Sequence, residues 1–210
     1  MTATPAGGRR AGPIEWGLAV QAVAGEPACG DLEVVQIFPS GVLIGAVDGL
    51  GHGQEAAEVA RRAAGALDGH AHEPVSRLFR RCHEALFETR GVVMSLASLN
   101  LSGPTLTWTG VGNVTAILLR AEPGDLPRQE SLLLRGGVVG FQLPLLSEDV
   151  LAIGPGDTLV LATDGVRPGF AESLQPGGPP QELAERILAQ HVKGTDDALV
   201  LVARFLGAPE

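Results

Sequence analysis

The chain has 210 residues, of which 45% are hydrophobic and 4% aromatic, and a chain of this length can bury a substantial apolar core without a disulfide or metal to hold it. Its 24 acidic residues outnumber its 15 basic residues, for a formal net charge of -9, which argues against nucleic acid or an anionic membrane as partner. Cys29 and Cys82 form neither a disulfide framework nor a zinc-site spacing, and with no signal peptide and no apolar run of about 20 residues a cytoplasmic location is expected.

The predicted elements follow the order strands, helix pair, strands, helix, strand. Short apolar or alternating runs bounded by Gly and Pro favour strands, and apolar residues at helical spacing favour helices. We expect strands over residues 14–23, 32–38, 41–47, 92–101, 105–111, 114–119, 148–153, 157–162 and 198–205, and helices over 55–67, 75–86 and 180–192. Because the helices are segregated from runs of strands, the order indicates an α+β sandwich and not a doubly wound parallel sheet.

The domain organisation is expected to be simple. No internal repeat is visible, and segments rich in Pro, Gly and polar residues occur only near the N-terminus and over residues 122–130 and 167–180, where we expect loops. We therefore expect one domain over residues 14–206, preceded by a flexible tail over 1–13 and followed by a short tail over 207–210.

Aspartates lie at the boundaries of several predicted strands. Asp48-Gly49 and Asp164-Gly165 each end an apolar strand, Asp31 precedes a strand, and the pair Asp196-Asp197 precedes the last one. Any one of them alone is typical of a turn or a helix cap. Together they favour carboxylates that a packed sheet brings into one place, where a hard divalent cation such as Mg²⁺ or Mn²⁺ relieves their repulsion.

The ordered set of these segments resembles a known family. The segments are Cys29–Asp31, Val47–Gly53, Gly110–Asn113, Ala162–Val166 and Gly194–Leu199. They are similar to the motifs of metal-dependent (PPM) protein serine/threonine phosphatases of type 2C, in their sporulation and stress-response branch, and most of all to small stressosome phosphatases. The likeness runs from about residue 14 to residue 206, and it implies two packed antiparallel β-sheets flanked by helices.

The resemblance also implies a set of site residues. Asp48 would be the carboxylate shared by two divalent cations, Mn²⁺ or Mg²⁺, and the backbone carbonyl of Gly49 would bind one of them. Asp164 and Asp196 would hold the second cation, and Asp31 would help to arrange metal-bound water. On this reading Asp48 and Asp164 are the catalytic residues, acting through that water. No arginine can be matched to the one that binds substrate phosphate in some distant relatives, so the substrate-binding residues are left unassigned.

The function implied is hydrolysis of phosphoserine or phosphothreonine on a protein of a bacterial stress-signalling complex, by a metal-activated water. The partner would be a phosphorylated scaffold or antagonist protein, and neither nucleic acid nor a membrane would take part. Two alternatives stay open: a catalytically silent phosphatase-fold binding module in the same kind of complex, and a phosphatase acting on a small phosphate ester.

Other motifs are weighed against plainer explanations. The glycines of residues 49–53 outline a dinucleotide-binding turn, but Asp48 would then face the pyrophosphate and a meander follows where a parallel strand should come. His52 is a minor candidate for contacting a metal-bound water or a phosphate, beside the plainer reading of an exposed polar residue. Residues 135–144 could shape substrate access or only join two strands, and Asn113 is interpreted as a turn residue.

Overall fold

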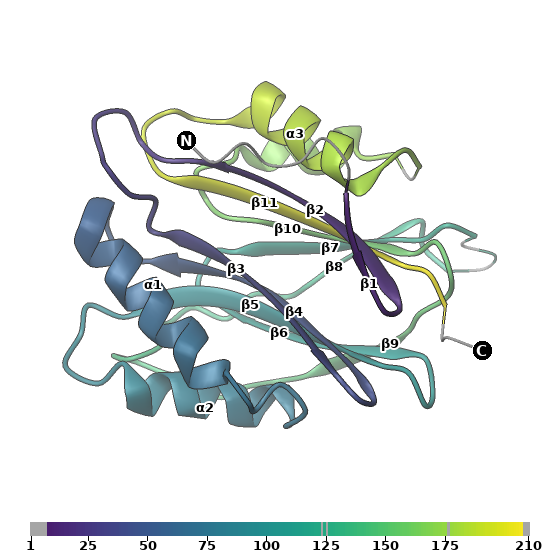
Figure 1. The fold of residues 1–210 in the computed structure, drawn as a ribbon, viewed down its shortest axis with the longest axis horizontal. Helices are drawn as coiled ribbons and strands as arrows, with labels where there is room; N and C mark the ends of the chain where they lie inside the picture. Colours follow the sequence, from purple (N-terminus) through teal and green to yellow (C-terminus); the bar gives the residue numbers. More distant parts are fainter. Residues whose placement is uncertain (1–7, 123, 125, 176, 208–210) are drawn as a thin grey trace.

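The computed structural model describes residues 8–122, 124, 126–175 and 177–207, which form two antiparallel sheets packed face to face (Figure 1). The first sheet contains, in order across it, β1 (Arg9–Ala11), β2 (Ile14–Gln21), β11 (Ala198–Phe205), β10 (Thr158–Ala162), β7 (Thr115–Leu119) and β8 (Gln129–Ser131). The second contains β3 (Asp31–Phe38), β4 (Gly41–Gly49), β5 (Val92–Asn100), β6 (Thr105–Val111) and β9 (Asp149–Ala152). The α+β sandwich expected from the sequence is confirmed.

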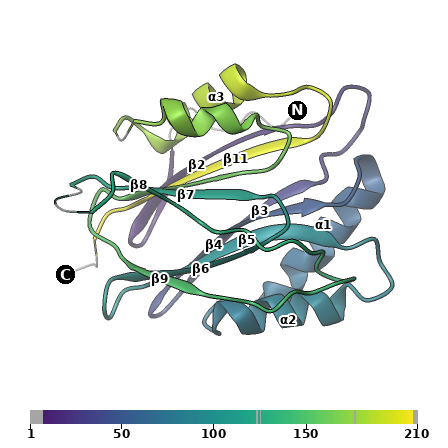
Figure 2. The same cartoon turned by 180° about the vertical axis from the view of Figure 1, so that it is seen from behind.

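Three apolar layers hold the sandwich together. The middle layer fills the space between the sheets with alternate residues of facing strands, such as Val42 and Ile44 of β4 and Leu199 and Leu201 of β11. An outer layer joins the second sheet to α1 (Gly53–Leu67) and α2 (Val75–Ala85), and another joins the first sheet to α3 (Pro180–His191). Figure 2 shows from behind that the helices cover only the outer faces.

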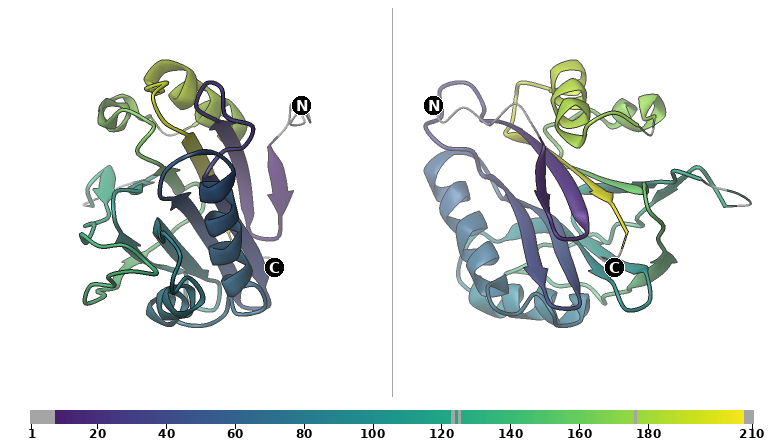
Figure 3. Two further views of the ribbon diagram at one scale, coloured as in Figure 1. Left: turned by 90° about the vertical axis from the view of Figure 1, so that its left-hand side faces the viewer. Right: turned by 45° about the vertical axis from the view of Figure 1, so that its right-hand side comes forward.

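Small residues let α1 lie close to its sheet. Its buried face carries Ala56, Ala57, Ala60 and Ala63, which add little thickness between the helix and β4. Figure 3 shows α1 running along the outside of the second sheet while α3 lies on the opposite side of the sandwich. None of the helices in the described part of the chain is long and apolar enough to cross a membrane.

The structure corrects three local expectations. Residues Arg9–Ala11, within the segment expected to be a tail, pair with β2 as the short edge strand β1. Residues Gln129–Ser131, partly within an expected loop, pair with β7 as β8, and the expected loop over 167–180 contains a short 3-10 helix, η1 (Pro168–Ser173). These segments are too short for periodicity to reveal them. Residues 1–7 and 208–210 of the expected tails lie outside the described residues.

The antiparallel order brings certain strand ends together. The C-terminal ends of β4 and β10 and the N-terminal ends of β3 and β11 lie at one end of the sandwich. β4 extends two residues further than the apolar pattern predicts, through Asp48 and Gly49, and β3 begins one residue earlier, at Asp31. The aspartates therefore belong to the sheet itself, which fixes where their side chains point.

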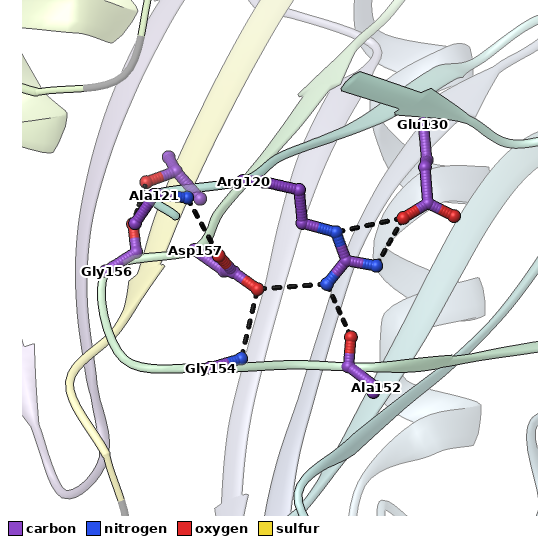
Figure 4. Close-up of polar contacts among 8 residues, drawn as sticks. Arg120, Ala121, Glu130, Ala152, Gly154, Gly156 and Asp157 are labelled. Carbon is purple, nitrogen blue, oxygen red and sulfur yellow. Dashed lines mark hydrogen bonds and ion pairs between the residues drawn. The ribbon is translucent and has the colours of Figure 1, made fainter. Parts of the chain in front are cut away.

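A buried ion-pair network closes the other end of the sandwich (Figure 4). Arg120, which follows β7 and is 5% exposed, donates to Glu130 of β8, to the Ala152 carbonyl of β9 and, over 3.0 Å, to Asp157. Asp157 also accepts backbone N–H groups from Ala121 at 2.9 Å and Gly154 at 3.0 Å. Because β9 belongs to one sheet and β8 to the other, the guanidinium ties the two sheets together.

Candidate metal centre

Strand alternation places Asp31 and Asp48 on the inner face of the sandwich. Successive side chains of a strand point to opposite faces, and Val42, Ile44 and Ala46 of β4 all pack between the sheets. Asp48 continues that series, and Asp31 is its direct cross-strand partner. The two carboxylates thus share one face at the end of the sandwich, where the apolar filling stops.

The opposite sheet contributes Thr163 and Asp164 to the same end. Thr163 follows β10, is fully buried, and donates its hydroxyl to Oδ2 of Asp31 over 2.6 Å. The same hydroxyl oxygen accepts the N–H of Leu199 at 2.8 Å, which ties it to β11. Asp164 is half-buried, and its Oδ2 accepts a hydrogen bond from the Asn113 side chain at 2.7 Å.

Asp196 and Asp197 are adjacent in sequence and differ in their surroundings. Asp197 is 3% exposed, and its two oxygens accept the backbone N–H groups of Val23 at 2.8 Å and Gly30 at 2.6 Å. Asp196 is only half-buried, and its carboxylate accepts the N–H of Asp197 at 2.9 Å. Asp197 therefore fixes the loop between β2 and β3, whereas Asp196 keeps one oxygen without a hydrogen-bond partner among the described residues.

Gly49 lies where β4 passes tightly against α1. A Cβ at this position would lie 2.2 Å from the Ala56 carbonyl oxygen, so any side chain would push the helix off the sheet. The Gly49 N–H donates to the Gly30 carbonyl at 3.1 Å, and Gly30 is itself held by Asp197. The backbone that bears the Gly49 carbonyl is thus fixed by both neighbouring segments.

Burial and mutual repulsion perturb the two inner carboxylates. Burial, together with the negative charges of Asp31 and Asp164, raises the pKa of Asp48 to about 8. Burial likewise raises the pKa of Asp31 to about 7, against the hydrogen bond from Thr163, which favours the charged form. Asp196 and Asp197 contribute repulsion at both positions, so these acids share one electrostatic environment.

The donor chemistry fits a hard divalent cation. Within the described residues, no three acidic, histidine or cysteine side chains already converge as a metal-binding group. Like charges oppose such convergence, and a cation between them would turn their repulsion into attraction. Carboxylate and carbonyl oxygens, with neither sulfur nor imidazole, are the donors that Mg²⁺ and Mn²⁺ prefer. We call Asp31, Asp48, Asp164 and Asp196 the carboxylate cluster.

His52 lies at the edge of this end of the sandwich. It is the residue before α1, is exposed, and its Nδ1 lies 2.7 Å from Oε1 of Glu26 in the loop between β2 and β3. No contact joins His52 to the carboxylate cluster among the described residues, and a role for it in binding water or phosphate stays a prediction.

The two cysteines are unsuited to act as nucleophiles. Burial raises the pKa of both Cys29 and Cys82 to about 12, so neither supplies a thiolate near neutral pH.

Two residues of the site, Thr163 and Asn113, are not evident from the sequence. No local pattern indicates a role for Thr163, and Asn113 is interpreted from its sequence as a turn residue without a link to Asp164. Their contacts depend on the packing of separate strands, which the local pattern does not reveal.

The chain is similar to known proteins over most of its length. The family described as Stage II sporulation protein E (SpoIIE) matches residues 39–206. Phosphoserine phosphatase RsbX of Bacillus subtilis (strain 168) is 24% identical over 184 residues, covering 86% of this chain and 89% of RsbX.

Solved structures share the fold. A chain from work on the bacterial stressosome, a modular system adapted to control secondary messenger signalling, superposes with a TM-score of 0.82 and 28% identity, covering 91% of this chain and 99% of that one. RsbX in complex with magnesium gives a TM-score of 0.83 at 21% identity, covering 94% and 98%. The serine/threonine phosphatase PstP/Ppp of Mycobacterium tuberculosis gives 0.67 at 17% identity, covering 92% and 99%.

Proposed function

Because this chain belongs to the stage II sporulation protein E (SpoIIE) family, we propose that its carboxylate cluster is the active centre of a divalent-cation-dependent protein serine/threonine phosphatase. The resemblance expected from the sequence, to type 2C phosphatases of the RsbX kind, is confirmed by the family match and by the similarity to RsbX. The observation that carries the proposal is the pairing of Asp31 with Asp48 on the inner face, where Asp31 is buried, Asp48 is half-buried and the two carboxylates repel each other.

Four positions would hold two divalent cations, Mn²⁺ or Mg²⁺. These are the carboxylates of Asp48, Asp164 and Asp196 and the carbonyl of Gly49, with Asp48 shared between the two cations. When bound, the cations would lower the pKa of water in the site and neutralise the charge on the phosphoryl oxygens. The backbone contacts of Gly49 hold its carbonyl in place before any cation arrives, which reduces the cost of ordering the site.

Asp31 would orient the attacking water. The hydrogen bond from Thr163 occupies Oδ2 of Asp31, which leaves Oδ1 to accept a hydrogen bond from a water molecule facing phosphorus. Thr163 is held in turn by the N–H of Leu199, so the carboxylate cannot rotate freely. An Asp31→Asn variant would therefore lower activity less than loss of Asp48, because it alters an orienting contact and not the shared ligand.

The substrate would be a phosphorylated protein of a bacterial stress-signalling complex. RsbX is named a phosphoserine phosphatase, and a structural relative at 28% identity comes from work on the bacterial stressosome. On this basis phosphoserine or phosphothreonine of a scaffold or antagonist protein is the substrate class. The retention of all the principal acids supports an active enzyme over a silent binding module.

The proposal is tested by comparing Asp48→Asn with the unaltered protein. Phosphate release from p-nitrophenyl phosphate and from a phosphoserine peptide is measured in Mn²⁺. Asp48→Asn should lower the rate by at least the roughly 10- to 100-fold that loss of an outer contact costs at metal sites. It should not lower the melting temperature of the metal-free protein, because asparagine lacks the negative charge that desolvation and the neighbouring carboxylates disfavour at this position.

Asp149→Asn is the matched control. Asp149 is exposed on β9, and its side chain makes no hydrogen bond or ion pair among the described residues. The Asp149→Asn variant should release phosphate at the same rate as the unaltered protein. Full activity in Asp48→Asn, or its unfolding in the absence of metal, would contradict the assignment.

A further inference from the structure

Asn113 is the residue of the turn between β6 and β7 whose side chain reaches the carboxylate cluster. It is exposed, and its side-chain amide donates from Nδ2 to Oδ2 of Asp164 over 2.7 Å. The two residues lie 51 positions apart in sequence and come from different connections, one following β6 and the other following β10. An ordinary turn residue would need no such contact.

The turn itself is fixed on both sides. Gly112 has a φ of +97°, and a Cβ there would lie 2.2 Å from Cβ of Val93, so the chain passes tightly against β5. The Gly112 N–H donates to the Arg135 carbonyl at 2.8 Å, and the buried Ser95 hydroxyl donates to the Val114 carbonyl at 2.6 Å. The backbone on either side of Asn113 is therefore held by hydrogen bonds, and the side-chain amide of Asn113 extends from a fixed position.

The amide contact decides which oxygen of Asp164 is free. With Oδ2 accepting from Asn113, Oδ1 has no hydrogen-bond partner among the described residues. An amide is also a neutral donor, so it orients the carboxylate without adding charge of either sign to the carboxylate cluster. A cationic side chain in its place would compete with the metal, and a carboxylate would repel Asp164.

We propose that Asn113 is a positioning residue that holds Asp164 with Oδ1 directed toward the divalent cation. The inference rests on the proposed metal centre and goes beyond it, because it assigns a role to a residue that is not a ligand. Outer contacts of this kind orient ligands at metal sites, and their loss typically weakens metal affinity about 10- to 100-fold.

Mn²⁺ binding, measured by titration calorimetry on metal-stripped protein, tests the role without any catalytic assay. Asn113→Ala should raise the Kd for Mn²⁺ by about tenfold, while the melting temperature of the metal-free protein changes by about 2 °C or less, as for other surface substitutions. Asn100→Ala is the control. Asn100 is also exposed, and among the described residues its side chain bonds only the Ser102 N–H, in the turn between β5 and β6.

A double substitution identifies the residue through which Asn113 acts. In an Asp164→Asn background, Asn113→Ala should cause no further loss of Mn²⁺ affinity, because the carboxylate that it orients is already gone. Additive losses, an unchanged Kd in Asn113→Ala, or an equal loss in Asn100→Ala would each overturn the inference.

Failure of the proposed function gives a different result. If the unaltered protein bound no Mn²⁺ at all, the metal centre and the role of Asn113 would both be wrong. If the unaltered protein bound Mn²⁺ and Asn113→Ala bound it equally well, only the role of Asn113 would be wrong.

Discussion

Replacing Arg120 by methionine should destabilise the protein strongly without affecting the metal centre. The guanidinium contacts Glu130, Asp157 and the carbonyl of Ala152, and both Arg120 and Asp157 are almost completely buried. Methionine has a similar length and no charge, so it would fill most of the space and remove all of these contacts. The change therefore isolates the electrostatic part of the network.

The loss of stability can be worked out from the acidic groups that remain once Arg120 is replaced. Glu130 is 22% exposed and can turn toward water. The Asp157 side chain is 7% exposed, and within the part of the chain that the structure describes it keeps only its two backbone donors, from Ala121 and Gly154. Removing one partner of a buried ion pair costs about 3–5 kcal/mol. For a domain of this size each kcal/mol lowers the melting temperature by about 2–4 °C, so a decrease of about 6–20 °C is expected.

Thermal and urea unfolding of metal-free protein, followed by circular dichroism, measures this effect. Arg77→Met is the control, because Arg77 is 69% exposed and lies 4.0 Å from Glu73, a surface pair worth less than about 1 kcal/mol. Mn²⁺ affinity should be unchanged in Arg120→Met, since the network lies at the opposite end of the sandwich. A melting temperature equal to that of Arg77→Met would show that the buried contacts of Arg120 contribute no net stability.

Two further predictions concern the carboxylates. Asp196→Asn should weaken Mn²⁺ binding with little effect on unfolding of the metal-free protein. Asp197→Asn should instead lower the melting temperature, because an amide cannot accept from two backbone N–H groups with both of its polar atoms. Equal effects of the two changes on Mn²⁺ affinity and on melting temperature would show that the two residues do not have separate roles. In the metal-free protein, the raised pKa values of Asp31 and Asp48 mean that the folded state binds protons more tightly than the unfolded state, so stability should be greatest near pH 4 and fall as the pH rises toward about 8. Melting temperatures at pH 5 and pH 8 measure this dependence. Glu73, whose pKa is lowered to about 2 by its hydrogen bond to Arg81, changes stability only below pH 5. An Asp31→Asn, Asp48→Asn double variant that keeps the full pH dependence would contradict the assignment.

Much of the fold follows from the sequence because its strands are strongly apolar. Residues 41–47 and 198–205 are almost entirely apolar or glycine, and both form strands as predicted. β1 and β8 were missed because a three-residue edge strand depends on the neighbour it pairs with and not on its own pattern. The Arg120 network could not be predicted for a similar reason, since Glu130 and Asp157 lie 10 and 37 positions from Arg120 in the sequence.

The site shows the same division between local and long-range information. Asp48 and Asp164 could be selected from the sequence because each precedes a glycine at the end of an apolar strand. The sequence could not show that Asp31 is the cross-strand partner of Asp48, since register is a property of two strands. Nor could it show that Asp197 is taken up by backbone N–H groups, because the donors, Val23 and Gly30, lie more than 160 residues earlier in the chain.

Phosphate release from a phosphoserine peptide by EDTA-treated protein, before and after Mn²⁺ is added back, measures whether the protein is a phosphatase that depends on a divalent cation. We expect no release above background in EDTA and restored release with Mn²⁺ or Mg²⁺, because the carboxylate cluster supplies oxygen ligands and no nucleophile of its own. Release that continues undiminished in EDTA would contradict it.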